Sequence, residues 1–531
     1  MTQELHRAAL GVVMPGFVGT RMPDWLGSRL AAGLAGAWIF GHNVESPEQV
    51  RTLNGQIHAQ AGRALVASDE EGGTVTRLEH RSGSSWPGHG ALGRANDTGL
   101  TRSVAAGLGR QAAACGVDLV AAPVADVNSE VTNPVIGVRS FGADPTLVAR
   151  HTTAFVRGLA DGGVLSCAKH FPGHGATTQD SHVDLPRVED SQAVVRARDL
   201  PPFAAAVAAG VDVLMTAHVA YRAWATTPAT VTPALIALAR EELGFEGVIC
   251  TDALDMAGID RVLGRHGGAV SALAAGVDLI CLGNPAFPRS YDAEADLDSF
   301  VGAIVTAVQR GDLAQERLLE AADRVRTMAA HRVRTRPERH APPVEDQHAL
   351  AAASASAGQA TAGPATAGPA TAGSADPVLV AAMTAASAAL EMHGTAPTVW
   401  DRPLAVAAPG ALNLASGTGF EAVLAEMVSV WPALWRADST QAALAHGGDL
   451  VVVTDDRLDT DRAHALLGRA AAVVHTGIGP PPGGRLAPDA VVLCTGGGGR
   501  ASARAAALTL SRAGGPEPET PGRAPENGRS T

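Results

Sequence analysis

The segment from residue 164 to residue 186 places many ionisable side chains directly after a short apolar run. The run, residues 164–168, consists of small and β-branched residues, which is the pattern of a strand buried on both faces. Proline and glycine interrupt the residues that follow, which indicates a loop at the carboxyl end of this strand. The ionisable residues of the loop are Lys169, His170, His174, Asp180, His182 and Asp184. Groups of these types can bind a polar ligand and transfer protons near neutral pH.

Lys169 is unusual because it is the only lysine in the 531 residues, and every other member of the 41 Lys and Arg residues is an arginine. An ammonium group is a compact charge that fits a tight polar pocket where a planar guanidinium would not. We therefore interpret Lys169 as a binding group. The alternative is one remaining lysine in an arginine-biased chain.

Asp180 and His182 are spaced for an acid/base pair. In an extended loop, residues two apart point the same way, so the carboxylate can accept the second N–H of the imidazole and fix its tautomer. Such an imidazole can give up a proton and take it back near neutral pH. The alternative is a surface loop in which Asp180 and His182 cap turns.

A zinc site is a second interpretation of this loop, because three imidazoles lie within thirteen residues, at His170, His174 and His182. Pro172 argues against it, since proline prevents the helix that usually sets a His-x-x-x-His spacing. Lys169 would also place a repelling cation beside the metal. We therefore expect no metal and no cofactor.

Short apolar runs that could position these residues recur between about residue 8 and residue 285, each followed by a loop and a helix-like segment. The eight runs are residues 10–14, 37–40, 64–68, 117–124, 164–168, 211–216, 248–251 and 277–282. This alternation predicts an α/β fold, a (β/α)8 TIM-type barrel. Polar residues at or just after the ends of different runs are Asp69, Asp126, Lys169, His218 and Asp252. Closing a barrel would bring these ends together on one face.

Three further loops carry candidate site residues: Asp69 and Arg77 in ASDEEGGTVTR, Arg139 in PVIGVRSFGADP, and Asp252 in VICTDALDM. Each has a structural alternative. Asp69 and Arg77 could form an ion pair, and Arg139 could be the partner of a carboxylate inside the scaffold. Asp255 competes with Asp252, or could be an acid at a helix N-terminus.

The chain exceeds the usual size of one domain, and its composition divides it into four parts. Residues 1–340 form the predicted catalytic domain, and residues 341–376, with the repeat TAGPATAGPATAG, form a flexible linker. Strand-like runs at residues 404–408, 449–453, 471–475 and 490–494 predict a smaller, open and mostly parallel α/β domain over residues 377–513. The proline-rich tail, residues 514–531, is expected to be disordered.

The net charge of −12 argues against nucleic acid or an anionic membrane as a partner, because both need clustered cations. The five cysteines are widely spaced, mostly in apolar runs, and indicate buried thiols in a reducing compartment. Residues 1–20 lack the features of a signal peptide, and no apolar run approaches the roughly 20 residues of a membrane helix. We therefore expect a cytoplasmic protein.

Five motifs together resemble those of the glycoside hydrolase family 3 β-N-acetylglucosaminidases, the NagZ-like group. They are KHFPGHGATTQDSH, SDEEGGTVTR, NPVIGVRSFGADP, MTAHV and TDALDM, and the resemblance covers roughly residues 8–335. It implies a retaining exo-hydrolase that removes terminal β-linked N-acetylglucosamine from cell-wall muropeptides, in peptidoglycan recycling, or from chitin-derived fragments. The second domain resembles the C-terminal domain of the family only loosely.

The resemblance also implies roles by position. Asp252 would be the nucleophile and His182 the acid/base, oriented by Asp180. The implied sugar-binding residues are Asp69, Arg77, Arg139, Lys169 and His170. One departure is Thr74, where the family often has arginine, and it puts some contacts at the rim in doubt.

These roles correspond to the two steps of a retaining glycosidase, through a covalent glycosyl-enzyme on Asp252. A neutral histidine base does not repel an anion, so inorganic phosphate could replace water as the acceptor. A phosphorylase of β-N-acetylglucosaminides or β-glucosides is therefore the first alternative. The second is a non-catalytic sugar-binding protein whose second domain recruits a partner.

Overall fold

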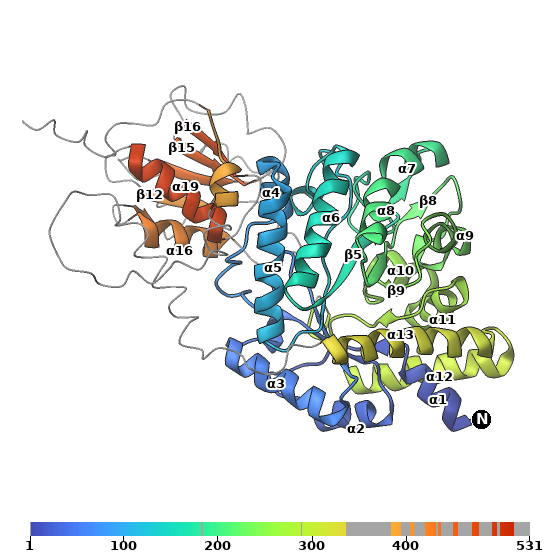
Figure 1. Cartoon of the computed structure of the whole chain (residues 1–531). Helices are drawn as coiled ribbons and strands as arrows, with labels where there is room; N and C mark the ends of the chain where they lie inside the picture. Colours follow the sequence, from blue (N-terminus) through green and yellow to red (C-terminus); the bar gives the residue numbers. More distant parts are fainter. Residues whose placement is uncertain are drawn as a thin grey trace, which may run out of the picture.

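The computed structural model of the chain is shown in Figure 1. It describes residues 2–181, 184–287, 289–335, 384–393, 404–407, 420–431, 434–436, 450–454, 470–476, 491–495 and 500–513. The predicted linker and tail, as well as His182, lie outside the described residues. In the described part of the chain, none of the helices combines the length and the apolar character needed to cross a bilayer.

The first sheet contains six parallel strands in the order β2-β3-β4-β5-β7-β9. They are β2 (Gly36–Ile39), β3 (Leu65–Ser68), β4 (Leu119–Val120), β5 (Leu165–Phe171), β7 (Val213–Thr216) and β9 (Val248–Thr251). A parallel pair, β1 (Val13–Met14) with β10 (Ile280–Cys281), lies between the two edges. A bridge from Cys250 to Leu279 joins it to β9, and the Trp38 amide donates to the Pro15 carbonyl at 2.9 Å on the β2 side. The result is a curled parallel sheet.

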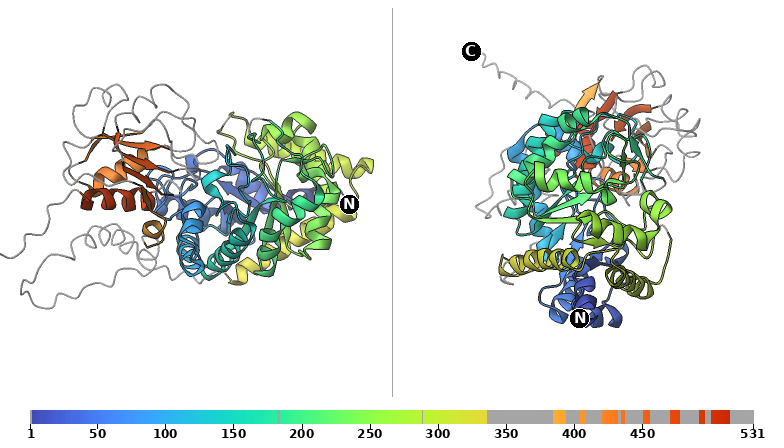
Figure 2. Two further views of the ribbon diagram at one scale, coloured as in Figure 1. Left: turned by 90° about the horizontal axis from the view of Figure 1, so that it is seen from above. Right: turned by 90° about the vertical axis from the view of Figure 1, so that its right-hand side faces the viewer.

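Helices surround this sheet, as Figures 1 and 2 show. They are α1 (Thr2–Leu10), α2 (Asp24–Ala32), α3 (Pro47–Gln60), α4 (His89–Ala95), α5 (Thr98–Ala114), α6 (Pro145–Asp161), α7 (Gln192–Arg198), α8 (Leu200–Ala208), α9 (Pro233–Ala237), α10 (Ala257–Leu263), α11 (Arg265–Ala275), α12 (Ala293–Arg310) and α13 (Gln315–Thr335). Short helical turns are η1 (Gly41–Asn43), η2 (Gly137–Arg139), η3 (Ala229–Val231) and η4 (Leu238–Glu242), and β6 (Arg187–Val188) pairs with β8 (Ala220–Tyr221). Side-chain N-caps begin several helices, for example Asp97 at α5 and Asp144 at α6, because their carboxylates accept otherwise unpaired amide protons.

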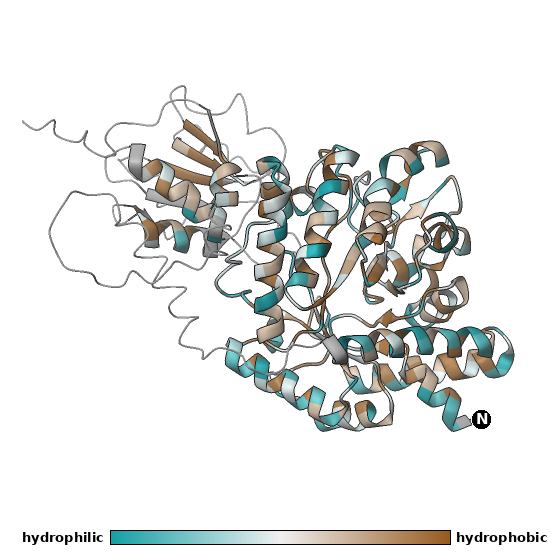
Figure 3. Ribbon diagram, viewed as in Figure 1, coloured by the Kyte–Doolittle hydropathy of each residue, from teal (hydrophilic) through white to brown (hydrophobic). Residues whose placement is uncertain are grey.

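The strands are buried on both faces, which explains why their sequences are nearly continuous apolar runs. Alternate residues, such as Leu65, Leu165 and Val213, pack together in one cluster, while their neighbours join the cluster that packs with the helices. In Figure 3 the strands are brown and many helices carry teal residues among brown ones. The carboxyl ends of the strands are thereby held in a rigid scaffold.

The second sheet has the order β11-β16-β15-β14-β12-β13, and all pairs are parallel except β11 with β16. Its strands are β11 (Glu391–His393), β12 (Leu404–Ala407), β13 (Trp435–Arg436), β14 (Leu450–Thr454), β15 (Ala470–His475) and β16 (Val491–Cys494). Helices α16 (Phe420–Val430) and α19 (Arg500–Ala513) pack against each other over a separate apolar cluster. The sheet is open and mostly parallel, as predicted. The domain limits at residues 340 and 376 lie outside the described residues, and the division into domains stays a prediction.

One prediction about local structure is wrong, because β5 continues through Lys169 and His170 to Phe171 instead of ending before them. The Lys169 amide donates to the Pro123 carbonyl, and its carbonyl accepts from the Ala125 amide at 2.7 Å. Ionisable side chains are tolerated in this strand because carboxylates lie beside them: Asp69 and Glu71, which follow β3, pair with Lys169, and Asp126, which follows β4, pairs with His170. The predicted burial of the five cysteines is confirmed, and the reducing compartment stays a prediction. Burial raises the pKa of Cys115 to about 12.

Candidate active site

The strand register brings the five polar residues predicted at strand ends to one edge of the curled sheet. Ser68 pairs with Val120, Val124 bridges to Lys169, and Thr216 pairs with Thr251. Lys169 is itself one of these positions, and Asp69, Asp126, His218 and Asp252 lie one or two residues beyond the others. The expectation that the strand ends meet is therefore correct for these residues.

Five charged side chains form an alternating chain at this edge. Lys169 Nζ lies 2.8 Å from Asp69 Oδ1 and 2.7 Å from Glu71 Oε1. Arg77 pairs with the other oxygen of Asp69 at 3.1 Å. Arg139 binds both oxygens of Glu71, at 2.8 and 2.9 Å. Three cations therefore enclose two carboxylates.

The burial of these groups differs along the chain of charges. The side chains of Lys169, Glu71 and Arg139 are only 3%, 1% and 5% exposed, whereas those of Asp69 and Arg77 are 18% and 15% exposed. Asp69 and Arg77 thus offer the atoms that a ligand can reach. Arg139 fits the structural alternative, a partner of a carboxylate inside the scaffold, because its guanidinium donates to Glu71 and to the Val135 carbonyl.

Charge pairing outweighs burial in setting the ionisation of this cluster. Burial alone would raise the pKa of Glu71, but Arg139 and Lys169 hold this pKa well below its usual range. Burial would also raise the pKa of Asp69, and Lys169 and Arg77 lower it in the same way. Burial lowers the pKa of Lys169, but the two carboxylates raise it above its ordinary value. Both carboxylates and the ammonium are therefore ionised at neutral pH.

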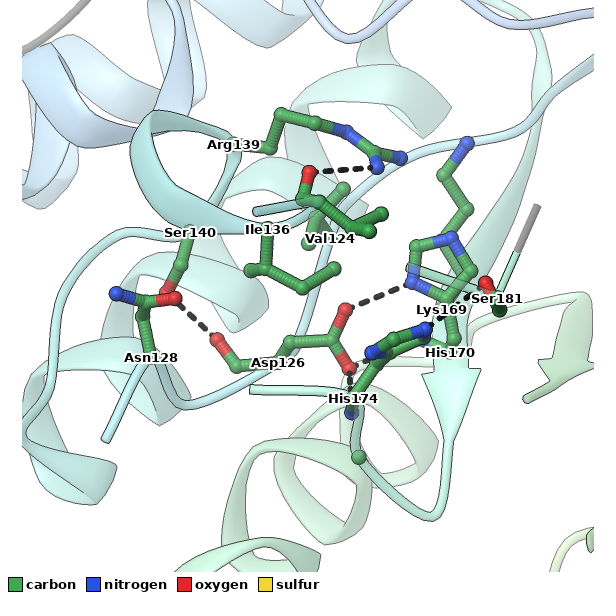
Figure 4. A network of polar contacts seen from close by, with 12 residues as sticks. Val124, Asp126, Asn128, Ile136, Arg139, Ser140, Lys169, His170, His174 and Ser181 are labelled. Atoms are coloured by element: carbon green, nitrogen blue, oxygen red, sulfur yellow. Dashed lines mark hydrogen bonds and ion pairs between the residues drawn. The ribbon is translucent and has the colours of Figure 1, made fainter. Parts of the chain in front are cut away.

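A second network, shown in Figure 4, centres on Asp126. Its fully buried carboxylate lies 2.7 Å from His170 Nδ1 and accepts the backbone amides of His170 and His174, at 3.1 and 2.7 Å. Burial would raise the pKa of Asp126, but His170 lowers it. The carboxylate therefore fixes the orientation and the tautomer of the His170 ring.

His174 links this network to the segment that leads into His182. Its Nδ1 lies 2.9 Å from Thr177 Oγ1 and its Nε2 lies 3.0 Å from Ser181 Oγ. Burial lowers the pKa of His174 to about 4, so the ring is neutral. Because both ring nitrogens have hydroxyl partners, His174 is poorly suited to the zinc interpretation. Among the described residues, no group of three or more potential ligands could hold a metal.

Ser181 is also tied to the loop that follows β9. Its carbonyl accepts the Gly258 amide at 3.0 Å, at the start of α10. A Cβ atom on Gly258 would lie 3.1 Å from the Ser181 oxygen and 3.2 Å from the Asp184 oxygen, so the two segments approach closely because this residue is glycine. The residue before His182 is thus fixed beside the loop of Asp252.

Two described residues flank His182 in this segment, and the Asp184 amide donates to the Asp180 carbonyl at 3.0 Å. Asp180 is half-buried, and the Asp180–His182 pairing stays a prediction because His182 lies outside the described residues.

Asp252 is half-buried directly after β9, and one of its oxygens accepts the Ala253 amide at 2.8 Å. Its negative charge is close enough to raise the pKa of the His174 ring, against the larger effect of burial. The competitor Asp255 accepts the Asn284 amide at 2.7 Å and packs so closely against Gly283 that a Cβ atom on this residue would overlap the carboxylate. Asp255 therefore anchors the loop after β10, and the assignment of Asp252 as the nucleophile stays a prediction.

Sequence reasoning missed Glu71, and it recorded Asp126 only as a strand-end residue. A usable signal existed for Glu71, because it lies two residues after Asp69 at a strand end, where alternate side chains share a face. Nothing comparable pointed to the contact between His174 and Ser181.

The comparisons with known proteins agree on one family. The model described as "Glycosyl hydrolase family 3 N terminal domain" matches residues 20–328. Beta-hexosaminidase A of Pseudoalteromonas piscicida is 33% identical over 319 residues, which cover 55% of this chain and 52%, about half, of that protein. A beta-hexosaminidase of Stenotrophomonas maltophilia is 35% identical over 325 residues, covering 58% of this chain and 94% of that protein.

A solved structure resembles the chain over nearly its whole length. It is a glycoside hydrolase family 3 beta-N-acetylglucosaminidase from Paenibacillus sp. str. FPU-7, with 27% sequence identity and a TM-score of 0.78. The match covers 96% of this chain and 97% of that one.

Proposed function

Because the chain belongs to glycosyl hydrolase family 3, we propose that it is a retaining exo-β-N-acetylhexosaminidase that releases terminal β-linked N-acetylglucosamine. One observation carries the proposal. The half-buried Asp252 lies at the same strand edge as the charged cluster of Asp69 and Lys169, beside the segment that leads into His182. A carboxylate next to a polar, partly accessible cluster suits a neutral sugar with many hydroxyl groups.

Asp252 is the proposed nucleophile. One of its oxygens attacks the anomeric carbon, and the bond from this carbon to the leaving oxygen breaks. His182, as the imidazolium, gives its proton to that oxygen, which leaves a covalent glycosyl-enzyme. The neutral His182 then takes a proton from water, and the water oxygen bonds to the anomeric carbon as the bond to Asp252 breaks. The Asp252 carboxylate is restored, and the sugar leaves with its anomeric configuration retained.

The position of His182 in this proposal depends on its neighbour Ser181. Two contacts, with His174 of the same loop and with Gly258 in the first turn of α10, hold Ser181 beside the segment that follows Asp252. We propose that Asp180 orients His182 in this setting. The pair of Asp126 and His170 is a second Asp–His arrangement at the same edge, so variants of both histidines are needed to assign the acid/base role.

For sugar binding, we propose that Asp69 accepts hydrogen bonds from sugar hydroxyl groups and that Arg77 donates to the substrate, because these two side chains are the accessible members of the cluster. Lys169 and His170 complete the same surface from β5. Arg139 supports sugar binding indirectly, because it positions Glu71, and Glu71 in turn positions Lys169.

We propose further that the curled sheet closes into a (β/α)8 barrel, which the contacts of the β1–β10 pair on both of its sides support. The second sheet is proposed to form a separate α/β domain after a flexible linker. Cell-wall muropeptides or chitin-derived fragments are the proposed substrates, with a role in peptidoglycan recycling in the cytoplasm.

Product analysis by NMR tests the proposal. An aryl β-N-acetylglucosaminide is incubated with the enzyme in phosphate-free and in phosphate-containing buffer. We expect free N-acetylglucosamine, first as the β anomer, in both buffers. The α anomer would refute a retaining mechanism, a sugar 1-phosphate would identify a phosphorylase, and binding without turnover would identify a non-catalytic sugar-binding protein.

A further inference from the structure

Arg500, the first residue of α19, contacts a loop of the first part of the chain, residues 79–85. Its backbone amide donates to the Ser84 carbonyl at 2.9 Å. Its Nη1 lies 3.4 Å from Ser85 Oγ and 3.7 Å from Glu79 Oε1. Glu79 closes this loop itself, because its carboxylate accepts both the amide and the hydroxyl of Ser85, at 2.7 and 2.6 Å.

Hydrogen bonds connect the loop directly to the charged cluster. The Glu79 amide donates to Thr76 Oγ1 at 3.1 Å, and this hydroxyl donates to Glu70 Oε2 at 2.7 Å. The other oxygen of Glu70 accepts the Arg77 amide at 2.7 Å. The Arg77 guanidinium then binds Asp69 at 3.1 Å. Every step from α19 to the accessible carboxylate of Asp69 is thus a polar contact of 3.7 Å or less.

Apolar packing supports the same docking independently. Ala385 is fully buried in the cluster that packs the helices on the first sheet. Its neighbour Ala386 packs with Ala505 of α19. In Figure 1 helix α19 lies on the side of α4 and α5, and the seen-from-above view of Figure 2 likewise places the second sheet beside the first part of the chain.

We propose that α19 docks on residues 79–85 through Arg500 and thereby holds Arg77 and Asp69 in the geometry that binds the sugar. Arg500 is a positioning residue, since it contacts neither the reacting atoms nor the two carboxylates at the strand edge. The second sheet would then support substrate binding by the first. The inference rests on the proposed function, because it assigns Arg77 and Asp69 to the sugar site.

The chain offers a matched control in Arg504, which lies one helical turn after Arg500. Both arginines bind Glu426 of α16, at 3.2 Å from Arg500 Nε and 3.1 Å from Arg504 Nη1. Arg500 additionally contacts residues 79–85, at Ser84, Ser85 and Glu79. Arg500→Ala should raise KM for the aryl glycoside about threefold to tenfold with little change in kcat, whereas Arg504→Ala should leave KM unchanged.

Two further measurements separate positioning from general destabilisation. In an Arg77→Ala background, Arg500→Ala should cause no additional rise in KM. Hydrogen exchange should become faster in Arg500→Ala at the amides of Arg77 and Leu78, which donate to Glu70, but not at Ile249 in β9. If Arg504→Ala has the same effect as Arg500→Ala, if the losses add in the Arg77→Ala background, or if exchange is unchanged, the proposal is wrong. Absence of turnover by the unaltered enzyme would refute the proposed function instead, and the exchange measurement would still test the docking.

Discussion

Replacing Lys169 by methionine tests whether the charged cluster is held together by its central cation. The ammonium lies 2.8 Å from Asp69 and 2.7 Å from Glu71, and its side chain is 3% exposed. At an effective dielectric constant of about 20, each contact has a gross Coulomb energy of about 6 kcal/mol, most of which offsets the cost of burying the charges. Removal of one partner of such a buried arrangement costs about 3–5 kcal/mol of unfolding free energy, because the remaining carboxylates lose their shared cation.

The assay is urea-induced unfolding followed by circular dichroism, with Arg102→Met as the control. Arg102 pairs with Asp161 at 2.6 Å, but both side chains are exposed, at 51% and 44%, so solvent screens the pair and its loss should change the unfolding free energy far less than the loss of Lys169. Because Lys169 lowers the pKa of Asp69 and Glu71, its contribution is present above the ordinary carboxyl range and is lost as the pH falls below about 4. The deficit of the variant should therefore shrink in acid. A deficit below about 1 kcal/mol at neutral pH, or one that does not depend on pH, would refute this reasoning.

Asp252→Asn should reduce turnover of aryl glycosides with good and with poor leaving groups alike, by at least about a thousandfold in kcat, whereas Asp255→Asn should remain active. His182→Ala should cost about 10²- to 10⁴-fold for poor leaving groups and much less for good ones; if His170→Ala shows this pattern instead, the acid/base role belongs to the other histidine. Burial raises the pKa of Glu70 from 4.5 to about 7, so the folded chain keeps a proton that the unfolded chain releases, and stability should fall by up to about 3 kcal/mol as the pH rises through this window. Glu70→Gln should remove this fall in urea midpoints, and an unchanged fall would contradict the assignment.

The strand scaffold could be predicted from the sequence because parallel strands buried on both faces are written as continuous apolar runs. Each of the eight predicted runs overlaps one of β1, β2, β3, β4, β5, β7, β9 and β10. The convergence of Asp69, Lys169 and Asp252 followed from the same rule, since parallel strands end at one edge. Burial of Cys167, Cys250 and Cys281 followed from their place in these runs.

The pairings inside the site could not be predicted in the same way. They depend on which strands are neighbours and on their register, neither of which is written in a local pattern. Lys169 was expected in a loop because a charge rarely lies in a buried strand, and only the carboxylates of Asp69 and Glu71 explain why it does. The neutral ring of His174 between Thr177 and Ser181 likewise depends on how the loop folds back.

The single lysine has a practical consequence. Reagents that acylate primary amines can find only one side-chain target in the entire chain, and that amine is enclosed between two acids and almost closed to solvent. The rate of acylation would therefore depend on how often the Lys169 amine becomes accessible to solvent. A saccharide that occupies the pocket should slow the labelling, which makes mass spectrometry of one peptide a direct record of occupancy.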